Sequence, residues 1–217
     1  TINTQPVSGT SAIGFTTTGS FTLAPNGGSF SSSFNWNPVV SGTYFDLPGG
    51  DFNYLRINNV TSLTGLKIGQ YTGTGLVGDS TFGVANSSDV TISTATTISG
   101  PISVYGGEIK VNANLASTAT SAPINLVASD IIGVSSGVSV TTQDGNILLA
   151  ANSDATGGGG ISLFKSSLIS NGGNITLGGG NITGSGYAEG SATSPGYSAS
   201  NDNYKGIWLN SATVNAG

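Results

Sequence analysis

Few side chains in this 217-residue chain could do chemistry, because the sequence contains no His and no Cys. Acid–base catalysis would depend on ten Asp and Glu residues, five Lys and Arg residues and the tyrosines. Asp79, Asp89, Asp130, Asp144 and Asp154 stand far apart in the sequence, although a repetitive fold could stack some of them. Because Asp favours turns, we interpret them as turn residues and predict that the chain is not an enzyme.

No cofactor is predicted from the sequence. The thiolate and imidazole ligands of zinc sites are missing. The phrases "TGGGGISLFK" and "SNGGNITLGGGN" lack the Asp of calcium-binding glycine-rich repeats. Asp144 in "QDGN" and Asp202 in "SNDNY" could donate oxygens to a structural calcium ion. Turn capping by these two aspartates is the preferred interpretation.

The segment 184–204, "GSGYAEGSATSPGYSASNDNY", is the best candidate for a binding site. It interrupts a regular strand pattern, and insertions in repeat folds map to loops that often bind ligands. Its aromatic rings could stack on a sugar while neighbouring polar groups form hydrogen bonds. The candidate ligand-binding residues are Tyr187, Glu189, Tyr197, Asp202, Asn203 and Tyr204. A tolerated surface insertion whose tyrosines pack on the coil edge is the alternative interpretation.

Charge and hydropathy exclude two classes of partner. The net charge is −5 and the five basic residues are scattered, whereas nucleic-acid binding needs clustered Lys and Arg. No apolar run is long enough to span a bilayer. The chain begins with Thr and shows no signal-peptide pattern, so we expect it to be a processed or excised segment.

The elements that would position these residues are short strands. The chain contains 35 Gly and only 7% charged residues, and its Thr, Val and Ile suit pleated, half-buried strands. After about residue 60, apolar residues occupy every second position in short runs, and no segment has a helical period. Successive runs begin at Ile109, Ile124, Ile147, Ile161 and Ile175, and we predict one solenoid coil per interval.

A glycine turn precedes several of these runs. "YGGEIKV", "QDGNILL" and "NGGNITL" share a glycine, one polar residue and then Ile-x-Val or Ile-x-Leu. Gly supplies positive φ or close backbone approach at low steric cost, and Asn tolerates the same conformation. The phrase therefore predicts a corner that leads into a strand of a β-solenoid.

The aromatic residues divide the chain into two predicted domains. They gather in the first 54 residues, whose alternating patterns suit a compact cap or small β module. We predict an aromatic-rich N-terminal β cap or module at 1–60 and a parallel β-helix at 61–217, with an inserted loop at 184–204.

The second region resembles the repeats of filamentous-haemagglutinin-type adhesins, which are large bacterial surface proteins. The matching text is "GPISVYGGEIKVNANL", "GNILLAANSDATGGGGISL", "SNGGNITLGGGNITG" and "GIWLNSATVNAG". The resemblance implies a right-handed parallel β-helix that is secreted and displayed on the cell surface. It also implies a role in attachment, with host-cell or surface glycans or neighbouring copies of the chain as partners.

Three other functions remain open from the sequence. An ice-binding solenoid would need ranks of outward Thr, for which Thr94 and Thr96 give one step. A filament subunit would stack its coils end to end between chains. A carbohydrate-active β-helix enzyme would need clustered Asp in a groove. We expect the adhesin function, as an attachment module or a rigid stalk.

Overall fold

The computed structural model describes residues 13–15, 19–23, 34–36, 55–57, 63–72, 83–84, 88–155, 158–180, 183–188 and 206–217. These residues form strands and turns and contain no helix. The all-β prediction is therefore confirmed for the part of the chain that is described.

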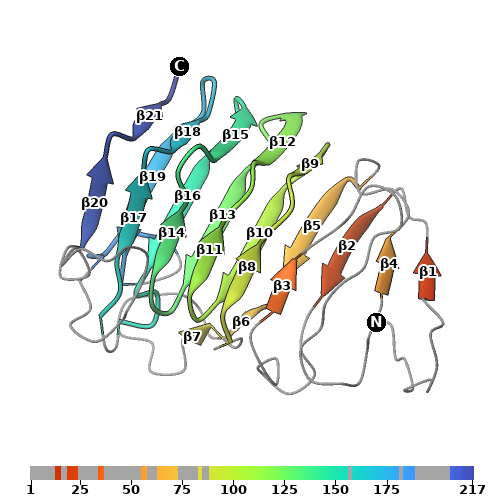
Figure 1. Ribbon diagram of the computed structural model, residues 1–217, viewed down its shortest axis with the longest axis horizontal. Coiled ribbons are helices and arrows are strands. Elements are labelled where there is room, and N and C mark those ends of the chain that lie inside the picture. Colours follow the sequence, from red (N-terminus) through yellow and green to blue (C-terminus); the bar gives the residue numbers. More distant parts are fainter. Residues whose placement is uncertain are drawn as a thin grey trace.

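Three parallel sheets make up most of this part (Figure 1). The first sheet contains β2 (Ser20–Leu23), β5 (Gly65–Ile68), β10 (Ile102–Gly106), β13 (Ile124–Ala128), β16 (Ile147–Ala151) and β19 (Ile175–Gly179). The second contains β3 (Phe34–Trp36), β8 (Val90–Ile92), β11 (Ile109–Val111), β14 (Ile132–Val134), β17 (Ile161–Phe164) and β20 (Ile207–Asn210). The third contains β9 (Thr96–Ile98), β12 (Leu115–Thr120), β15 (Ser139–Gln143), β18 (Ser167–Ile169) and β21 (Thr213–Asn215).

Two short pairs lie outside these sheets. Strand β1 (Ile13–Phe15) pairs in parallel with β4 (Leu55–Ile57), at the end of the molecule opposite β20 and β21 (Figure 1). Strands β6 (Tyr71–Thr72) and β7 (Gly83–Val84) form an antiparallel pair between β5 and β8 in the sequence.

The chain visits the three sheets in turn, as β10, β11 and β12 illustrate. Each of these strands then pairs in parallel with the strand that follows one coil later, which is β13, β14 or β15. Stacking of coils through parallel strand pairs is the architecture of a parallel β-solenoid, so this part of the fold prediction is confirmed.

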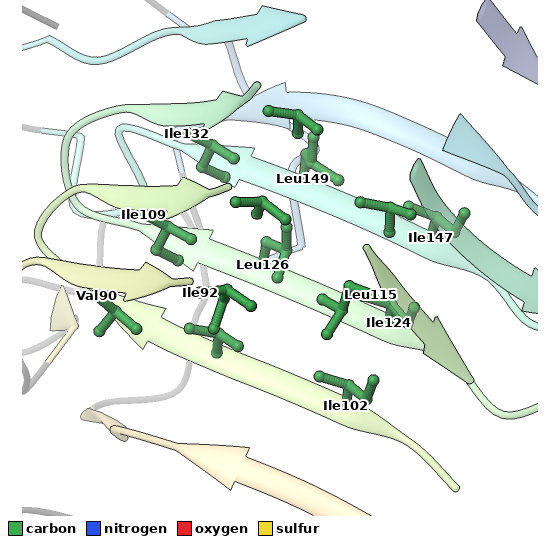
Figure 2. Packing of buried hydrophobic residues seen from close by; sticks show 14 of the residues in the cluster. Val90, Ile92, Ile102, Ile109, Leu115, Ile124, Leu126, Ile132, Ile147 and Leu149 are labelled. Atoms are coloured by element: carbon green, nitrogen blue, oxygen red, sulfur yellow. The ribbon is translucent and has the colours of Figure 1, made fainter. Parts of the chain in front are cut away.

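Inward-facing aliphatic side chains form columns along the stack (Figure 2). Ile102, Ile124 and Ile147 occupy the same register position in three consecutive coils, and all three are fully buried. A second column consists of Val90, Ile109 and Ile132. The period-two pattern of the sequence directs every second side chain into this core, and burial of such apolar surface is the main stabilising contribution to the fold.

The prediction of one coil per interval holds from Ile124 to Ile147, which pair in the first sheet, but it is wrong for the intervals that follow. Ile147 and Ile175 pair with each other in the first sheet, while Ile161, which lies between them in the sequence, belongs to the second sheet. The coil from Ile147 to Ile175 therefore spans two of the predicted intervals. Strands of different sheets face the same core and have the same Ile-x-Leu pattern, so periodicity alone does not distinguish them.

The glycine phrase does form a corner that leads into a strand. In "SNGGNITL", Asn171 has φ +50° and β19 begins four residues later. A Cβ on Gly173 would meet the carbonyl oxygen of Gly145 in the preceding coil, and a Cβ on Gly145 would meet that of Ala122. Glycine is required at Gly145 and Gly173 because the stacked backbones approach too closely for a side chain.

Two strands from the aromatic N-terminal region extend the solenoid. Strand β2 pairs with β5, and β3 pairs with β8. Trp36 is fully buried, its ring centroid lies 6.4 Å from that of Phe21, and its Nε1 donates a 2.8 Å hydrogen bond to Thr96 Oγ1. Most of residues 1–60 lie outside the described part, so the predicted boundary at residue 60 stays a prediction.

Candidate functional site

The turns that join the first sheet to the second differ greatly in length, and we call this edge the insertion corner. Two residues (107–108) separate β10 from β11, and three (129–131) separate β13 from β14. The next two coils have nine residues (152–160) and twenty-seven residues (180–206) at this corner. The segment between β5 and β8 (69–89) is also long and contains the β6–β7 pair.

The other two corners are short from β8 onward. Turns from the second sheet to the third contain two to four residues, as in 165–166 and 135–138. Turns from the third sheet to the first contain three to five residues, as in 144–146 and 170–174. The long insertions that follow β8 therefore leave the solenoid along a single edge.

The base of the longest insertion is held on the solenoid by backbone contacts. Gly186 N–H donates to Gly179 O at 2.8 Å, and Gly179 N–H donates to Gly186 O at 3.2 Å. Cβ atoms on Gly178 and Gly179 would meet the carbonyl oxygens of Gly184 and Tyr187. The glycines of "LGGGNITGSG" therefore allow the chain to fold back on the end of β19.

This returning segment covers the outer face of the first sheet. A Cβ built on Gly184, which has φ +66°, would lie 2.9 Å from Leu148 and 3.7 Å from Ala150. Ala150 is fully buried and belongs to a small apolar cluster outside the main core, with Leu148 packed against it. The base of the insertion is thus anchored by apolar contact as well as by hydrogen bonds.

Tyr187, which the sequence singled out, projects from this anchored base. Its side chain is 84% exposed, the highest value among the exposed large hydrophobic residues of the described part. The adjacent Ala188 packs against the core, so the backbone at Tyr187 is fixed while its ring is free to contact a ligand. The other predicted site residues lie outside the described residues: Glu189, Tyr197, Asp202, Asn203 and Tyr204.

Carboxylates that are distant in sequence are brought together at the insertion corner. Glu108 N–H donates to Asp89 Oδ1 at 3.0 Å, and Lys110 Nζ lies 2.7 Å from Glu108 Oε2. Burial raises the pKa of Asp130, and the nearby charges of Glu108, Asp89 and Asp154 raise it further. The spacing of the aspartates allowed some of them to stack in a repetitive fold. This group of carboxylates, and Glu108 as one of its members, could not be recognised from that spacing.

A pattern in the sequence does indicate this grouping of carboxylates. Asp89, Glu108 and Asp130 each precede a second-sheet strand by one or two residues. An acidic residue at that position in successive coils must lie at the same corner once the strands are in register. Among the described residues, however, no three His, Cys, Asp or Glu side chains form a group that could hold a metal ion.

Asp144, which the sequence offered as an alternative calcium ligand, lies at a different corner from this acidic group. It is exposed, has φ +60° and stands at the turn that precedes β16. Positive φ in a turn is tolerated by Asp better than by most residues, so the turn interpretation accounts for this residue. Asp202 lies outside the described residues.

Outward-facing residues at the same register position in successive strands form a rank on each sheet. Within each of the three ranks, the side chains differ in chemistry. In the first sheet the rank reads Thr22, Lys67, Ser103, Asn125, Leu148 and Thr176. In the second it reads Thr91, Lys110, Gly133, Ser162 and Trp208, and in the third Thr97, Ala116, Thr141, Ile169 and Asn215. Neither a Thr rank nor any other uniform rank appears among these described positions.

The Thr94–Thr96 step of the ice-binding interpretation does not point outward at both positions. Thr96 is 1% exposed, accepts the hydrogen bond from Trp36 and donates one to Thr94 O at 3.0 Å. Its hydroxyl therefore serves the core rather than a solvent-facing array.

One aromatic pair on the second sheet was not predicted. The rings of Phe164 and Trp208 stack with centroids 6.0 Å apart and an interplanar angle of 9°. Both side chains are half-buried, and Lys165 Nζ lies 5.2 Å from the Phe164 ring centroid. Pairing of β17 with β20 brings these residues together across the 180–206 insertion, so sequence distance concealed the contact.

Searches against protein-family models, curated proteins and solved structures found no match to this chain. In the described part of the chain, no helix is long and apolar enough to cross a membrane.

Proposed function

We propose that this chain is a non-catalytic segment of a secreted bacterial surface adhesin, in which a right-handed β-solenoid displays glycan-binding loops along its insertion corner. The observation that supports this proposal best is that, from β8 onward, the long insertions gather at one edge while the other two corners stay short. Binding loops positioned by a rigid scaffold are a common way for proteins to present recognition residues.

The base of the 180–206 insertion supports a recognition role for Tyr187. A tyrosine supplies a large contact area with few rotatable bonds, so little conformational entropy is lost on binding. Here its backbone is fixed by the Gly179–Gly186 hydrogen bonds before any ligand arrives, while 84% of its side chain is exposed. This arrangement is favourable for stacking on a sugar ring.

The scaffold suits a stalk as well as a binding module. Its core columns are continuous through successive coils, and each coil is joined to the next by three parallel strand pairs. In this proposal the aromatic-rich N-terminal region forms a cap over one end, which agrees with the full burial of Trp36.

A glycan-array screen tests the proposal. The wild-type chain is compared with a variant in which residues 186–203 are replaced by a short Gly-Ser turn. We expect specific glycan binding by the wild type and loss of that binding in the variant. The variant should stay folded but unfold at a somewhat lower temperature, because it lacks Ala188, which packs against the core. Absence of binding by both proteins would contradict the attachment function and favour a spacer.

A matched control replaces the neighbouring insertion. Residues 154–159 are exchanged for a short Gly-Ser turn, which alters the same corner one coil earlier but keeps Tyr187 and the 180–206 segment. We expect this control to retain glycan binding. Equal loss in both variants would show that the effect comes from general disturbance of the corner.

A filament subunit is the second candidate, because the last described coil exposes inward-facing residues. Ile207, Leu209 and Val214 are 42%, 50% and 42% exposed, although their counterparts in the preceding coils are largely buried. End-to-end stacking of coils would cover such residues. Sedimentation over a range of protein concentrations tests this candidate, and a monomer throughout would exclude it.

A further inference from the structure

Buried oxygens without a donor are concentrated at the insertion corner. Within the described residues, six buried side-chain oxygens have no hydrogen-bond partner, and four of them lie at this corner: Glu108 Oε1, Asp130 Oδ1, Asn152 Oδ1 and Ser153 Oγ. The other two are Ser162 Oγ and Ser166 Oγ. Asn152 and Ser153 are 3% and 0% exposed, and Glu108 is 9% exposed. Most buried polar groups in folded proteins are paired, so each such atom requires a physical explanation.

Backbone hydrogen bonds place these residues in adjacent turns. Asp130 N–H donates to Gly107 O at 3.0 Å, beside Glu108. Asn152 N–H in turn donates to Asp130 O at 3.0 Å. Three successive coils, stacked about 4.8 Å apart, therefore contribute the four oxygens to one corner, with Asp130 in the middle.

The chemistry of these atoms favours a positive partner. Ionised carboxylate oxygens and the amide oxygen only accept hydrogen bonds, so Glu108 Oε1, Asp130 Oδ1 and Asn152 Oδ1 cannot satisfy one another, and the Ser153 hydroxyl has a single proton to donate. Lys110 Nζ contacts Glu108 Oε2, which is the other oxygen of that carboxylate. A single cation can neutralise several buried acceptors at once, and a hard divalent cation prefers carboxylate, amide and hydroxyl oxygens.

We propose that the insertion corner binds a divalent cation of the calcium type between coils, with Asp130 as the central ligand and Glu108, Asn152 and Ser153 as further oxygen donors. The described residues provide no group of three acidic, His or Cys side chains for a metal. The proposed ligand set therefore combines two carboxylates with neutral oxygens, and backbone carbonyls and water complete the shell.

The proposed site differs in place and role from the Asp144 and Asp202 positions considered from the sequence. It lies where the 152–160 insertion leaves the solenoid. Gly180 N–H also donates to Asn152 O at 2.9 Å, which connects the corner to the start of the 180–206 insertion. A bound cation would fix both turns relative to the coils beneath them.

Crowding of negative charge at this corner supports the site. Glu108 N–H donates to Asp89 Oδ1 at 3.0 Å, so a further carboxylate lies beside the Glu108 turn. A cation reverses the effect of this crowding, because it stabilises the ionised carboxylate.

Thermal unfolding of the full chain with calcium chloride or with a chelator tests the proposal. At a calcium concentration about 100 times the dissociation constant, we expect the Tm to rise by about 5–10 °C. Asp130→Asn and Asn152→Ala should lose most of this rise. Asp144→Asn, which removes an exposed carboxylate at another corner, should keep it.

Isothermal titration with calcium chloride should show saturable binding by the wild type and none by Asp130→Asn.

Three results would overturn the proposal. The first is a Tm that does not change with calcium or magnesium. The second is an equal calcium-dependent rise in the wild type and Asp130→Asn, which would place the ion elsewhere. The third is a Tm that rises on acidification but not with either cation, which would show that protons, and not metal ions, neutralise the corner.

Discussion

The insertion corner and the corner between the third and first sheets differ in how much the length of their turns varies. At the latter, Gly145 and Gly173 stack so closely on the preceding turn that a Cβ would strike a backbone carbonyl. At the insertion corner, adjacent turns range from two residues (107–108) to twenty-seven (180–206). From β9 onward, successive turns at the third-to-first corner contain only three to five residues. The insertion corner accepts insertions of up to twenty-seven residues, although a Cβ on Gly159 in its 152–160 turn would also meet a backbone carbonyl, that of Asp130.

The two corners also differ in charge. The insertion corner gathers Asp89, Glu108, Asp130 and Asp154, whose interaction is evident in the raised pKa of Asp130. From β9 onward, the turns of the third-to-first corner contain one exposed carboxylate, Asp144, beside neutral contacts such as the 2.9 Å hydrogen bond from Asn174 N–H to Asn146 Oδ1. In this molecule, variable length and charge coincide at one edge, which is the reason for placing function there.

The largest expected effect is that of Gly145→Ala. Its Cβ would strike the carbonyl of Ala122, so the turn must move, and we expect a loss of about 2–4 kcal/mol in the free energy of unfolding. Urea denaturation measures this loss. The control is Gly137→Ala, where no atom lies within 4 Å but φ is +76°, with an expected cost of about 1–2 kcal/mol. Equal losses in the two variants would contradict the close-stacking argument.

Asp130→Asn should change the pH dependence of stability in metal-free buffer. Because the folded-state pKa is raised above 3.8, the folded chain binds this proton more tightly than the unfolded chain does. Protonation of Asp130 therefore stabilises the folded chain fully below pH 3.8. This stabilisation is lost as the pH rises through the folded-state pKa of Asp130. Thermal melts with a chelator from pH 3 to 8 should show a smaller decline for the variant. An unchanged decline would contradict the carboxylate grouping.

Shortening the 152–160 insertion should have a smaller effect. Replacement of 154–159 by a short Gly-Ser turn removes no core side chain, and loop length influences stability only weakly. We expect a change within about 1 kcal/mol by urea denaturation. A matched insertion of six Gly and Ser residues after Gly145 should destabilise the chain more, and the reverse order would contradict the difference between corners.

The smallest expected effect on stability is that of Tyr187→Ala. The side chain is 84% exposed, so its removal should change the free energy of unfolding by less than about 0.5 kcal/mol. Circular dichroism during thermal unfolding measures this. A substantial loss would mean that the ring packs on the solenoid and is not presented to a ligand.

Much of the architecture could be predicted because inward-facing and outward-facing side chains alternate along each strand. Ile102, Ile124 and Ile147 are recognisable as core residues from alternation alone, and the glycine phrase before Ile175 was interpreted correctly as a corner. Coil length could not be predicted, because second-sheet strands such as that at Ile161 repeat the pattern of the first sheet.

Of the candidate sites, only Tyr187 could be predicted from the sequence, because the others depend on which strands and turns stack. Tyr187 lies in an interruption of the strand pattern, which the sequence displays directly. The grouping of Glu108 with Asp130 depends on which turns stack, and turn lengths at this corner follow no fixed repeat. The stacking of Phe164 on Trp208 likewise depends on a pairing across a twenty-seven-residue insertion.

The most direct test of the insertion corner as a binding face is the affinity of Tyr187→Ala for the best glycan found on the array. Biolayer interferometry compares it with the wild type and with Phe164→Ala, which removes an outward aromatic side chain from the second sheet. The account predicts at least a tenfold weaker affinity for Tyr187→Ala, equivalent to about 1.4 kcal/mol, and no change for Phe164→Ala. Unchanged affinity of Tyr187→Ala together with a loss for Phe164→Ala would contradict the account and place recognition on the face of the second sheet.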